Sequence, residues 1–300
     1  MGLSRRDVLQ LAGAAVLPAA HAAQPAPATK PIPSSGERIP VVGLGTWITF
    51  NVGRDPVGRK ESAEVVRNFL DLGGRMIDSS PMYGSSQDVV GEALAKVGGL
   101  QRVFSADKVW TSGDGAAQAE QSRNLWRVPR FDLLQVHNLL AWEKQLPLIE
   151  TMKAHGRVRY VGITTSEGRR HADFEKIMRD RRLDFVQLTY NIVDREAEER
   201  LLPLAQERGI AVIANRPFQE GALTKKLARH PLPAWAREIE CRTWAQAVLK
   251  YIVTHPAITC AIPATSRVDH VRENMAAATG RMPDEAFRRQ MAEHVRKLGV

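Results

Sequence analysis

Hydrophobic and polar residues alternate along this 300-residue chain in two kinds of segment. Short runs rich in β-branched residues, typical of buried parallel strands, alternate with longer stretches whose apolar residues recur at helical spacing. The pattern predicts strands at residues 41–45, 76–78, 103–108, 133–137, 160–164, 185–189, 211–215 and 259–262. It predicts a helix after each strand, near residues 62–72, 89–97, 118–126, 143–155, 172–179, 196–207, 244–254 and 268–278.

Eight repeats of strand and helix predict the fold class. A closed α/β barrel of the (β/α)8 or TIM type accommodates eight such units more naturally than an open sheet, and about 250 residues suffice for it. No compositional break occurs between residues 40 and 280, so we expect residues 39–300 to form one domain. Residues 284–298 predict a trailing C-terminal helix, and residues 218–240 predict a loop over the barrel mouth.

The first residues of the chain follow a different pattern. Arg5 and Arg6 precede an apolar run over residues 9–20, which ends in Ala20-His21-Ala22. This arrangement predicts a signal peptide of the twin-arginine type at residues 1–22. The run is shorter than the ~20 residues of a membrane-spanning helix, so we expect no membrane span in the mature protein. We therefore expect transfer by the twin-arginine export machinery, a periplasmic location, and a flexible Pro/Ala-rich lead-in at residues 23–38.

The composition narrows the choice of partners. The formal net charge is +9, from 42 Lys+Arg against 33 Asp+Glu, and such an excess attracts anions. The basic residues are scattered through predicted helices and are not interleaved with aromatic residues, so we do not expect nucleic acid as a partner. Cys241 and Cys260 have no metal-binding spacing and allow at most one disulfide, so no structural metal is expected.

Four polar residues follow three successive predicted strands. Asp78 and Lys108 end the second and third strands, Tyr83 lies in the loop after the second, and His137 ends the fourth. In a (β/α)8 barrel the carboxyl ends of the strands converge on one mouth, where active sites form. Each residue alone has an ordinary structural explanation, but together they make a coherent acid–base set. The sequence therefore predicts a catalytic site of Asp78, Tyr83, Lys108 and His137.

Several segments resemble the aldo-keto reductase family. Gly43-Leu44-Gly45-Thr46-Trp47, residues 77–84 and residues 132–138 are similar to its hallmark segments, and the resemblance extends over residues 39–278. The order Asp, Tyr, Lys, His is similar to the family's catalytic tetrad. The resemblance implies an NAD(P)H-dependent oxidoreductase that reduces aldehydes or ketones to alcohols by hydride transfer.

The resemblance also implies a role for each member of the tetrad. Hydride addition leaves charge on the carbonyl oxygen, so the site needs a proton donor there. Tyr83 is the expected general acid, and a cation at Lys108 is expected to lower the phenol pKa from its ordinary value near ~10. Asp78 is expected to pair with Lys108, and His137 to orient the carbonyl.

The cofactor contacts are likewise implied by the resemblance. No G-x-G-x-x-G follows a predicted strand, so a Rossmann domain is not expected. By resemblance, Gln187 contacts the nicotinamide, Glu273 and Asn274 contact the adenine, and Arg267 and Arg272 lie near a 2′-phosphate. Arginine's planar fork suits phosphate, which favours NADP(H) over NAD(H).

Two positions depart from the family pattern. Thr164 and Thr165 stand where the family commonly has Ser-Asn to hold the carboxamide, and Asn215 and Arg216 stand where an aromatic residue often stacks on the nicotinamide. A flat amide or guanidinium could take over the stacking. A cation there would disfavour the positively charged oxidised nicotinamide.

Three aromatic residues are candidates for the substrate pocket. Trp47, Trp110 and Phe218 follow predicted strands and would give an apolar lining suited to a small-molecule carbonyl substrate. Two alternatives remain open at this point. The barrel could bind a nucleotide without catalysis, as a sensor or partner subunit, or it could be a lyase that uses Lys108 as a Schiff-base amine.

Overall fold

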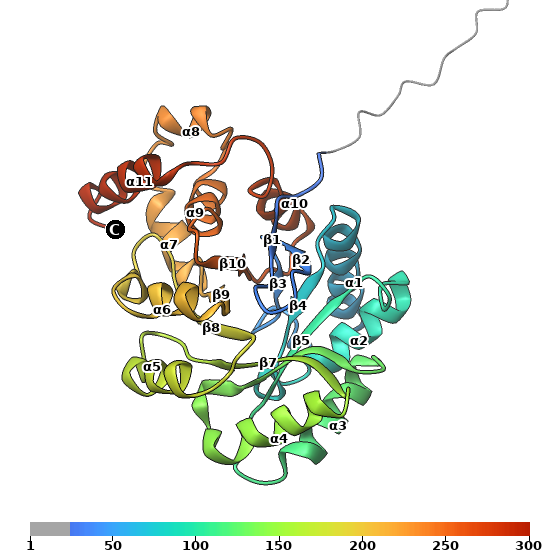
Figure 1. Cartoon of the computed structure of the whole chain (residues 1–300). Coiled ribbons are helices and arrows are strands. Elements are labelled where there is room, and N and C mark those ends of the chain that lie inside the picture. Colours follow the sequence, from blue (N-terminus) through green and yellow to red (C-terminus); the bar gives the residue numbers. More distant parts are fainter. Residues whose placement is uncertain (1–24) are drawn as a thin grey trace, which may run out of the picture.

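A computed structural model describes residues 25–300, so the predicted signal peptide at residues 1–22 lies outside the described residues. Parallel strands form the barrel in the order β10 to β3 (Figure 1). The bridges of Val42 with Ala261 and of Gly45 with Ala264 join the first strand to the last. The predicted (β/α)8 barrel is thus confirmed, with β3 (Leu44–Gly45), β4 (Met76–Asp78), β5 (Phe104–Val109), β6 (Phe131–Val136), β7 (Val158–Thr164), β8 (Phe185–Thr189), β9 (Ala211–Asn215) and β10 (Ile258–Ala261).

Helices surround the strands on the outside of the barrel (Figure 1). The first begins at Pro56, earlier than predicted, because Asp55 accepts hydrogen bonds from the first-turn amides and proline suits the first turn. The outer helices are α1 (Pro56–Asp71), α2 (Ser86–Val97), α3 (Gly115–Trp126), α4 (Trp142–Ala154), α5 (His171–Asp180), α6 (Leu201–Arg208), α9 (Trp244–Val253) and α10 (Val268–Ala276). Short 3-10 turns are η1 (Pro81–Tyr83), η2 (His137–Leu139), η3 (Glu196–Glu198) and η4 (Gln219–Gly221).

The segment expected to be a loop at residues 218–240 is partly helical. It contains α7 (Ala222–Leu227) and α8 (Trp235–Glu238), which bury Leu223, Leu227 and Trp235. The predicted C-terminal helix is present as α11 (Glu285–Lys297). It packs on α8, where Trp235 lies 6.0 Å from Phe287 between ring centroids. Apolar residues inside the expected loop therefore pack against the trailing helix.

A short hairpin closes the amino-terminal end of the barrel. Strands β1 (Thr29–Pro31) and β2 (Arg38–Pro40) pair antiparallel, and Ile32 and Ile39 join the apolar cluster inside the barrel. The Lys30 ammonium donates to the carbonyl of Ile258, the first residue of β10, at 2.6 Å. The structure differs here from the expected flexible lead-in, because two isoleucines among the prolines supply apolar area that the barrel floor buries.

Three further features bear on partners and chemistry. Over residues 25–300, no helix has the length and apolar character needed to cross a membrane. Within the same range, no three His, Cys, Asp or Glu side chains are grouped as a metal ion would require. Cys241 and Cys260 are buried free thiols and do not form a disulfide.

Candidate active site

The carboxyl ends of β4, β5 and β6 bring the four predicted residues together. Asp78 ends β4 and Lys108 lies near the end of β5. The Lys108 ammonium donates to Asp78 Oδ1 at 2.5 Å and to the carbonyl of Ser79 at 2.8 Å. The lysine is completely buried and Asp78 is nearly so, which makes this an ion pair inside the barrel.

Tyr83 and His137 complete the group. Tyr83 ends η1, a turn started by Pro81 and by the Ser80 hydroxyl, which accepts from the amide of Met82. The Lys108 ammonium lies 5.0 Å from the centroid of the Tyr83 ring. The Tyr83 and His137 rings meet edge to face with centroids 5.6 Å apart. The phenol, the ammonium and the imidazole therefore share one small volume at the barrel mouth.

Burial and charge act in opposite directions on the ion pair. Burial alone would lower the pKa of Lys108, but the neighbouring Asp78 carboxylate and Tyr83 raise it above its ordinary value. Lys108 is thus a protonated ammonium held by a carboxylate. A protonated, fully buried and paired amine is a poor nucleophile, which argues against the Schiff-base alternative.

The pKa of Tyr83 differs from the expectation. Burial raises it above its ordinary value, and this outweighs the lowering by the Lys108 cation. The sequence led us to expect a net lowering, but it could not show that the surroundings of the half-buried Tyr83 side chain would outweigh the nearby cation. Tyr83 therefore carries its proton throughout the neutral range.

His137 is neutral and oriented by a serine. Burial and then the Lys108 charge lower its pKa to about 2. Its Nδ1 lies 2.8 Å from Ser80 Oγ. Because that hydroxyl accepts from the Met82 amide, its own proton is available to Nδ1, which favours the tautomer with the proton on Nε2. The imidazole can thus donate a hydrogen bond as a neutral group, as its expected orienting role requires.

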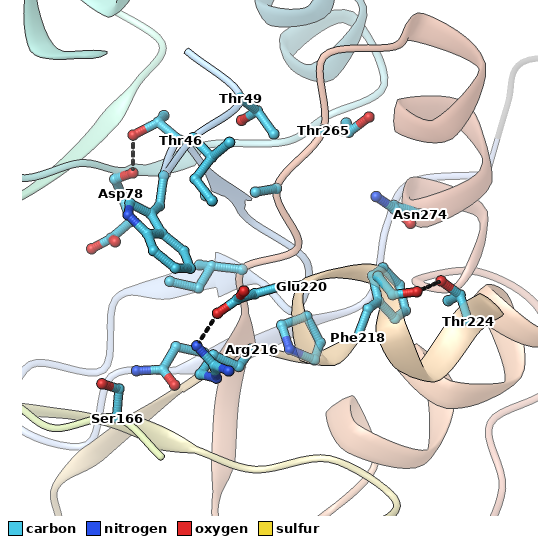
Figure 2. A pocket seen from close by; sticks show the side chains of 18 of the residues that line it. Thr46, Thr49, Asp78, Ser166, Arg216, Phe218, Glu220, Thr224, Thr265 and Asn274 are labelled. Carbon is cyan, nitrogen blue, oxygen red and sulfur yellow. Dashed lines mark hydrogen bonds and ion pairs between the residues drawn. The ribbon is translucent and has the colours of Figure 1, made fainter. Parts of the chain in front are cut away.

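A cavity of about 720 Å³ opens beside the tetrad. Figure 2 shows Asp78 and Asn274 on opposite sides of it, with Arg216 and Glu220 between them. Most of the predicted cofactor and substrate residues line the cavity: Thr164, Gln187, Asn215, Arg216, Glu273, Asn274, Trp47 and Phe218. The strand ends thus bring together residues that lie far apart in the sequence.

Three predicted residues lie outside the cavity lining. Arg267 is paired with Asp269 at 2.5 Å, and its side chain is 63% exposed. Arg272 points toward α1, where it donates to Asn68 Oδ1 at 3.1 Å. Trp110 is 40% exposed and does not line the cavity. The structure therefore does not bring these side chains to the predicted site.

The two departures from the family pattern are held within hydrogen-bond networks. The Asn215 amide donates to the carbonyl of Thr165 at 2.9 Å and accepts from the Thr189 hydroxyl at 2.7 Å. Arg216 pairs with Glu167 at 2.9 Å and with Glu220. Arg216 is thus not a bare cation, and the expected repulsion of an oxidised nicotinamide loses its basis.

Sequence reasoning missed several residues of the site. Ser80 orients His137, and Thr265, His270 and Trp244 line the cavity. His270 could have been found from helical spacing, because it lies one turn before Glu273 and Asn274 on α10 and shares their face. Trp244 gave no such signal, since it follows the segment expected to be a loop.

An ammonium, a phenol and a neutral imidazole lie together at the carboxyl ends of the barrel strands. Such a group of side chains is suited to an enzyme that transfers a proton to its substrate. A profile of the Aldo/keto reductase family matches residues 41–293. The chain belongs to the aldo/keto reductase family, so the NAD(P)H-dependent reduction of carbonyls that the resemblance implied is the chemistry that this geometry serves.

Individual relatives agree with this assignment. Methylglyoxal reductase YeaE of Escherichia coli is 29% identical over 260 residues, which cover 82% of this chain and 88% of that protein. The NADH-specific methylglyoxal reductase of the same organism is 24% identical, over 84% of this chain and 94% of that one. A Klebsiella pneumoniae aldo/keto reductase solved with NADP and acetate has a TM-score of 0.73 at 24% identity, covering 86% of this chain and 92% of that chain.

Proposed function

We propose that this protein reduces a small aldehyde or ketone to an alcohol with NADP(H), with Tyr83 as the general acid. The observation that carries the proposal is the Lys108 ammonium, held by Asp78 at 2.5 Å and lying 5.0 Å from the Tyr83 ring. A protonated phenol beside a permanent cation can give up its proton at the moment when charge develops on a carbonyl oxygen.

The chain's own residues then have separate tasks. The nicotinamide cofactor, when bound, supplies the hydride. His137 donates from its neutral ring and orients the carbonyl oxygen, while the Tyr83 hydroxyl delivers the proton to it. Lys108 stabilises the phenolate that remains, and Asp78 keeps Lys108 charged.

The residues of the cavity suit a dinucleotide. The Gln187 Nε2 is buried at the cavity wall without a hydrogen-bond partner among the described residues, so a carboxamide oxygen could accept from it. At the other side, Thr265, His270, Glu273 and Asn274 offer polar groups to an adenosine. The Klebsiella pneumoniae relative solved with NADP supports the same cofactor here.

A preference for NADP(H) over NAD(H) would depend on Arg267. Its present partner, Asp269, is as exposed as the arginine itself, and water screens an exposed ion pair so that it contributes little to stability. A 2′-phosphate can therefore replace the carboxylate on the planar guanidinium. His270 and Thr265, which line the cavity nearby, would add further donors.

The deciding experiment follows NADPH oxidation with a panel of aldehydes and ketones that includes methylglyoxal, the substrate that two relatives are named for. We expect turnover in the wild type and a loss of roughly 10²- to 10⁴-fold in kcat for Tyr83→Phe, with the affinity for NADPH unchanged. Wild-type kcat in Tyr83→Phe would refute the assigned acid. Tight NADPH binding without turnover of any carbonyl would favour the non-catalytic alternative.

We also propose that the mature protein is periplasmic. The support is the sequence of the first 22 residues, with Arg5 and Arg6 ahead of an apolar run and Ala20-His21-Ala22. Fractionation of cells that express the whole chain, compared with the variant Arg5→Lys/Arg6→Lys, tests it. We expect the variant to stay in the cytoplasm, and equal distribution of both proteins would contradict export by this route.

A further inference from the structure

The strand that carries Lys108 departs from the regular ladder of the barrel at that residue. Along β5, the amide of Phe104 donates to the carbonyl of Arg75 at 2.8 Å. Two residues further on, the carbonyl of Ala106 accepts from the amide of Ser79 at 3.0 Å. Main-chain groups of alternate residues in a parallel strand face the same neighbour. The next amide to face β4 is therefore that of Lys108, and its partner in a regular ladder would be the Ser79 carbonyl.

Asp107 replaces this ladder bond. The Lys108 amide donates to Asp107 Oδ1 at 2.7 Å. The Ser79 carbonyl instead accepts from the Lys108 ammonium at 2.8 Å, and the same ammonium donates to Asp78 Oδ1 at 2.5 Å. A carboxylate is a strong acceptor for a main-chain amide, which makes the exchange favourable. The end of β4 thus holds the charged end of the lysine and not its main chain.

Two outer helices hold Asp107 in place. Phe104 and Ala106 belong to the apolar cluster inside the barrel, so the alternation along β5 directs Asp107 outward. There Gln87 of α2 donates to Asp107 Oδ2 at 2.7 Å and to Ser122 Oγ of α3 at 2.9 Å. Each oxygen of the carboxylate therefore accepts from one donor, and the group cannot turn away from the Lys108 amide without losing a hydrogen bond.

A carboxylate at this position is unfavourable unless it has such a task. Asp107 is completely buried, and burial raises its pKa to about 7. The Lys108 amide and ammonium act against this rise, and the Asp78 carboxylate adds to it. A neutral side chain would avoid the burial of a second negative charge near Asp78, so the presence of Asp107 requires an explanation.

We propose that Asp107 is a positioning residue of the tetrad. Its carboxylate takes the Lys108 amide out of the ladder and leaves the Ser79 carbonyl for the ammonium, which is thereby directed to Asp78 and Tyr83. Asp107 does not line the cavity and acts only through Lys108. This inference rests on the proposed function, since the positioning serves the proton transfer from Tyr83.

The test compares Asp107→Leu with Asp107→Asn. Both variants lack the charge, but only the asparagine keeps an oxygen that can accept from the Lys108 amide. In Asp107→Leu the amide returns to the Ser79 carbonyl, and the ammonium loses that hydrogen bond. We expect kcat to be roughly 10-fold lower in Asp107→Leu than in Asp107→Asn, with little difference in KM, because a hydrogen bond to a charged group is lost.

The titration of Tyr83 gives a readout that a purely structural role would not move. The phenolate absorbance of Tyr83 is taken without cofactor, as the difference from the same protein carrying Tyr83→Phe. It should appear at lower pH in Asp107→Asn than in the wild type, because the Asp107 charge raises the pKa of Tyr83. It should appear at higher pH in Asp107→Leu than in Asp107→Asn, because the ammonium is less well placed.

A matched control uses another buried carboxylate that accepts from a strand amide. Asp184, next to the amino end of β8, is buried and accepts from the Val161 amide at 2.8 Å and from the Lys153 ammonium at 2.6 Å. We expect Asp184→Leu to lower the melting temperature but to leave kcat and the Tyr83 titration as they are in the wild type. If Asp107→Leu likewise lowers only the melting temperature and matches Asp107→Asn in kcat and Tyr83 titration, the proposal is overturned.

A measurement on Lys108 itself covers the case in which Asp107→Leu does not fold. With lysine labelled by heavy nitrogen, the amide signal of Lys108 is assigned by its absence from the spectrum of Lys108→Arg. In the wild type this signal should move as Asp107 releases its proton near pH 7, and in Asp107→Asn it should not. The same response to pH in both proteins would overturn the proposal. A wild type that reduces no carbonyl refutes the proposed function instead, and the Lys108 and Tyr83 signals still test the positioning.

Discussion

Two ion-pair groups at the barrel mouth differ in burial. Lys108 and Asp78 are 0% and 2% exposed, whereas Arg216 is 22% exposed and its partners Glu167 and Glu220 are 43% and 42% exposed. Breaking a buried pair by removing one partner typically costs about 3–5 kcal/mol, because a charge is left in a dry interior. An exposed pair contributes only about 0–1 kcal/mol and exchanges partners with water or ligand.

The difference separates two tasks within one cavity. The buried pair can keep Lys108 in one place through the whole reaction, which proton transfer requires. The Arg216–Glu167 pair connects the loop after β7 with the segment after β9, whereas the Arg216–Glu220 pair lies within that segment. Both pairs are exposed enough to open when a long ligand enters. Burial, more than the type of residue, thus decides which charged side chains take part in proton transfer and which can separate to admit a ligand to the cavity.

The largest effect should come from breaking the buried pair. Lys108→Met leaves the Asp78 carboxylate unpaired in the barrel, and we expect the free energy of unfolding to fall by about 3–5 kcal/mol along with loss of turnover. Denaturant unfolding measures the change. The double variant Asp78→Asn/Lys108→Met should recover much of the stability but none of the activity. Equal stability of the single variant and the wild type would contradict burial of this pair.

His137 gives the next effect, through the pH dependence of stability. In the folded protein the pKa of His137 is about 2, below its ordinary value of 6.5. Below pH 6.5 the imidazole is therefore protonated in the unfolded chain but stays neutral in the folded protein. Stability should therefore fall from pH 6.5 downward, with a contribution of up to about 1.4 kcal/mol per pH unit. Unfolding of wild type and His137→Gln across this range checks the sign. Parallel curves for the two proteins would show that His137 is not buried as described.

The eight-unit barrel and the tetrad could be predicted because both follow from local patterns. The periodicity of strands and helices can be recognised from residues that are neighbours in the sequence. Once the strands are identified, the (β/α)8 fold places their carboxyl ends at one mouth of the barrel. Asp78, Lys108 and His137 come together for that reason. The hairpin at β1 and β2 escaped prediction because its stability comes from the distant floor of the barrel.

Side-chain partners were the least predictable part of the site. Nothing adjacent in the sequence shows that Arg272 reaches Asn68 across to α1, or that Glu167 from another loop pairs with Arg216. The net direction of the Tyr83 pKa shift depended in the same way on the packed surroundings of this half-buried side chain. The residue types show which side chains are charged, but only the packed structure shows which partner neutralises each charge.

A smaller effect should distinguish the two arginines of the eighth unit. Because Arg267 can exchange Asp269 for a phosphate, Arg267→Ala should weaken NADPH binding roughly 10-fold, as the loss of a charge-assisted hydrogen bond would. NADH binding should change little. Arg272→Ala is the matched control, since its guanidinium contacts Asn68 on the outer surface. Fluorescence titration with both cofactors measures this, and equal losses for NADPH and NADH in Arg267→Ala would exclude a phosphate contact.

The smallest effect should come from uncovering Arg216 at the exposed group. Glu167→Gln/Glu220→Gln removes both balancing carboxylates, so the guanidinium becomes a bare cation beside the cavity. We expect roughly threefold weaker binding of the oxidised cofactor than of the reduced one, since the exposed pairs contribute only about 0–1 kcal/mol. Isothermal titration with both forms measures the ratio, and adding Arg216→Gln to the double variant should restore it. If Glu167→Gln/Glu220→Gln lost as much stability and turnover as Lys108→Met, the exposed pairs would matter as much as the buried pair. The distinction between the two ion-pair groups would then be wrong.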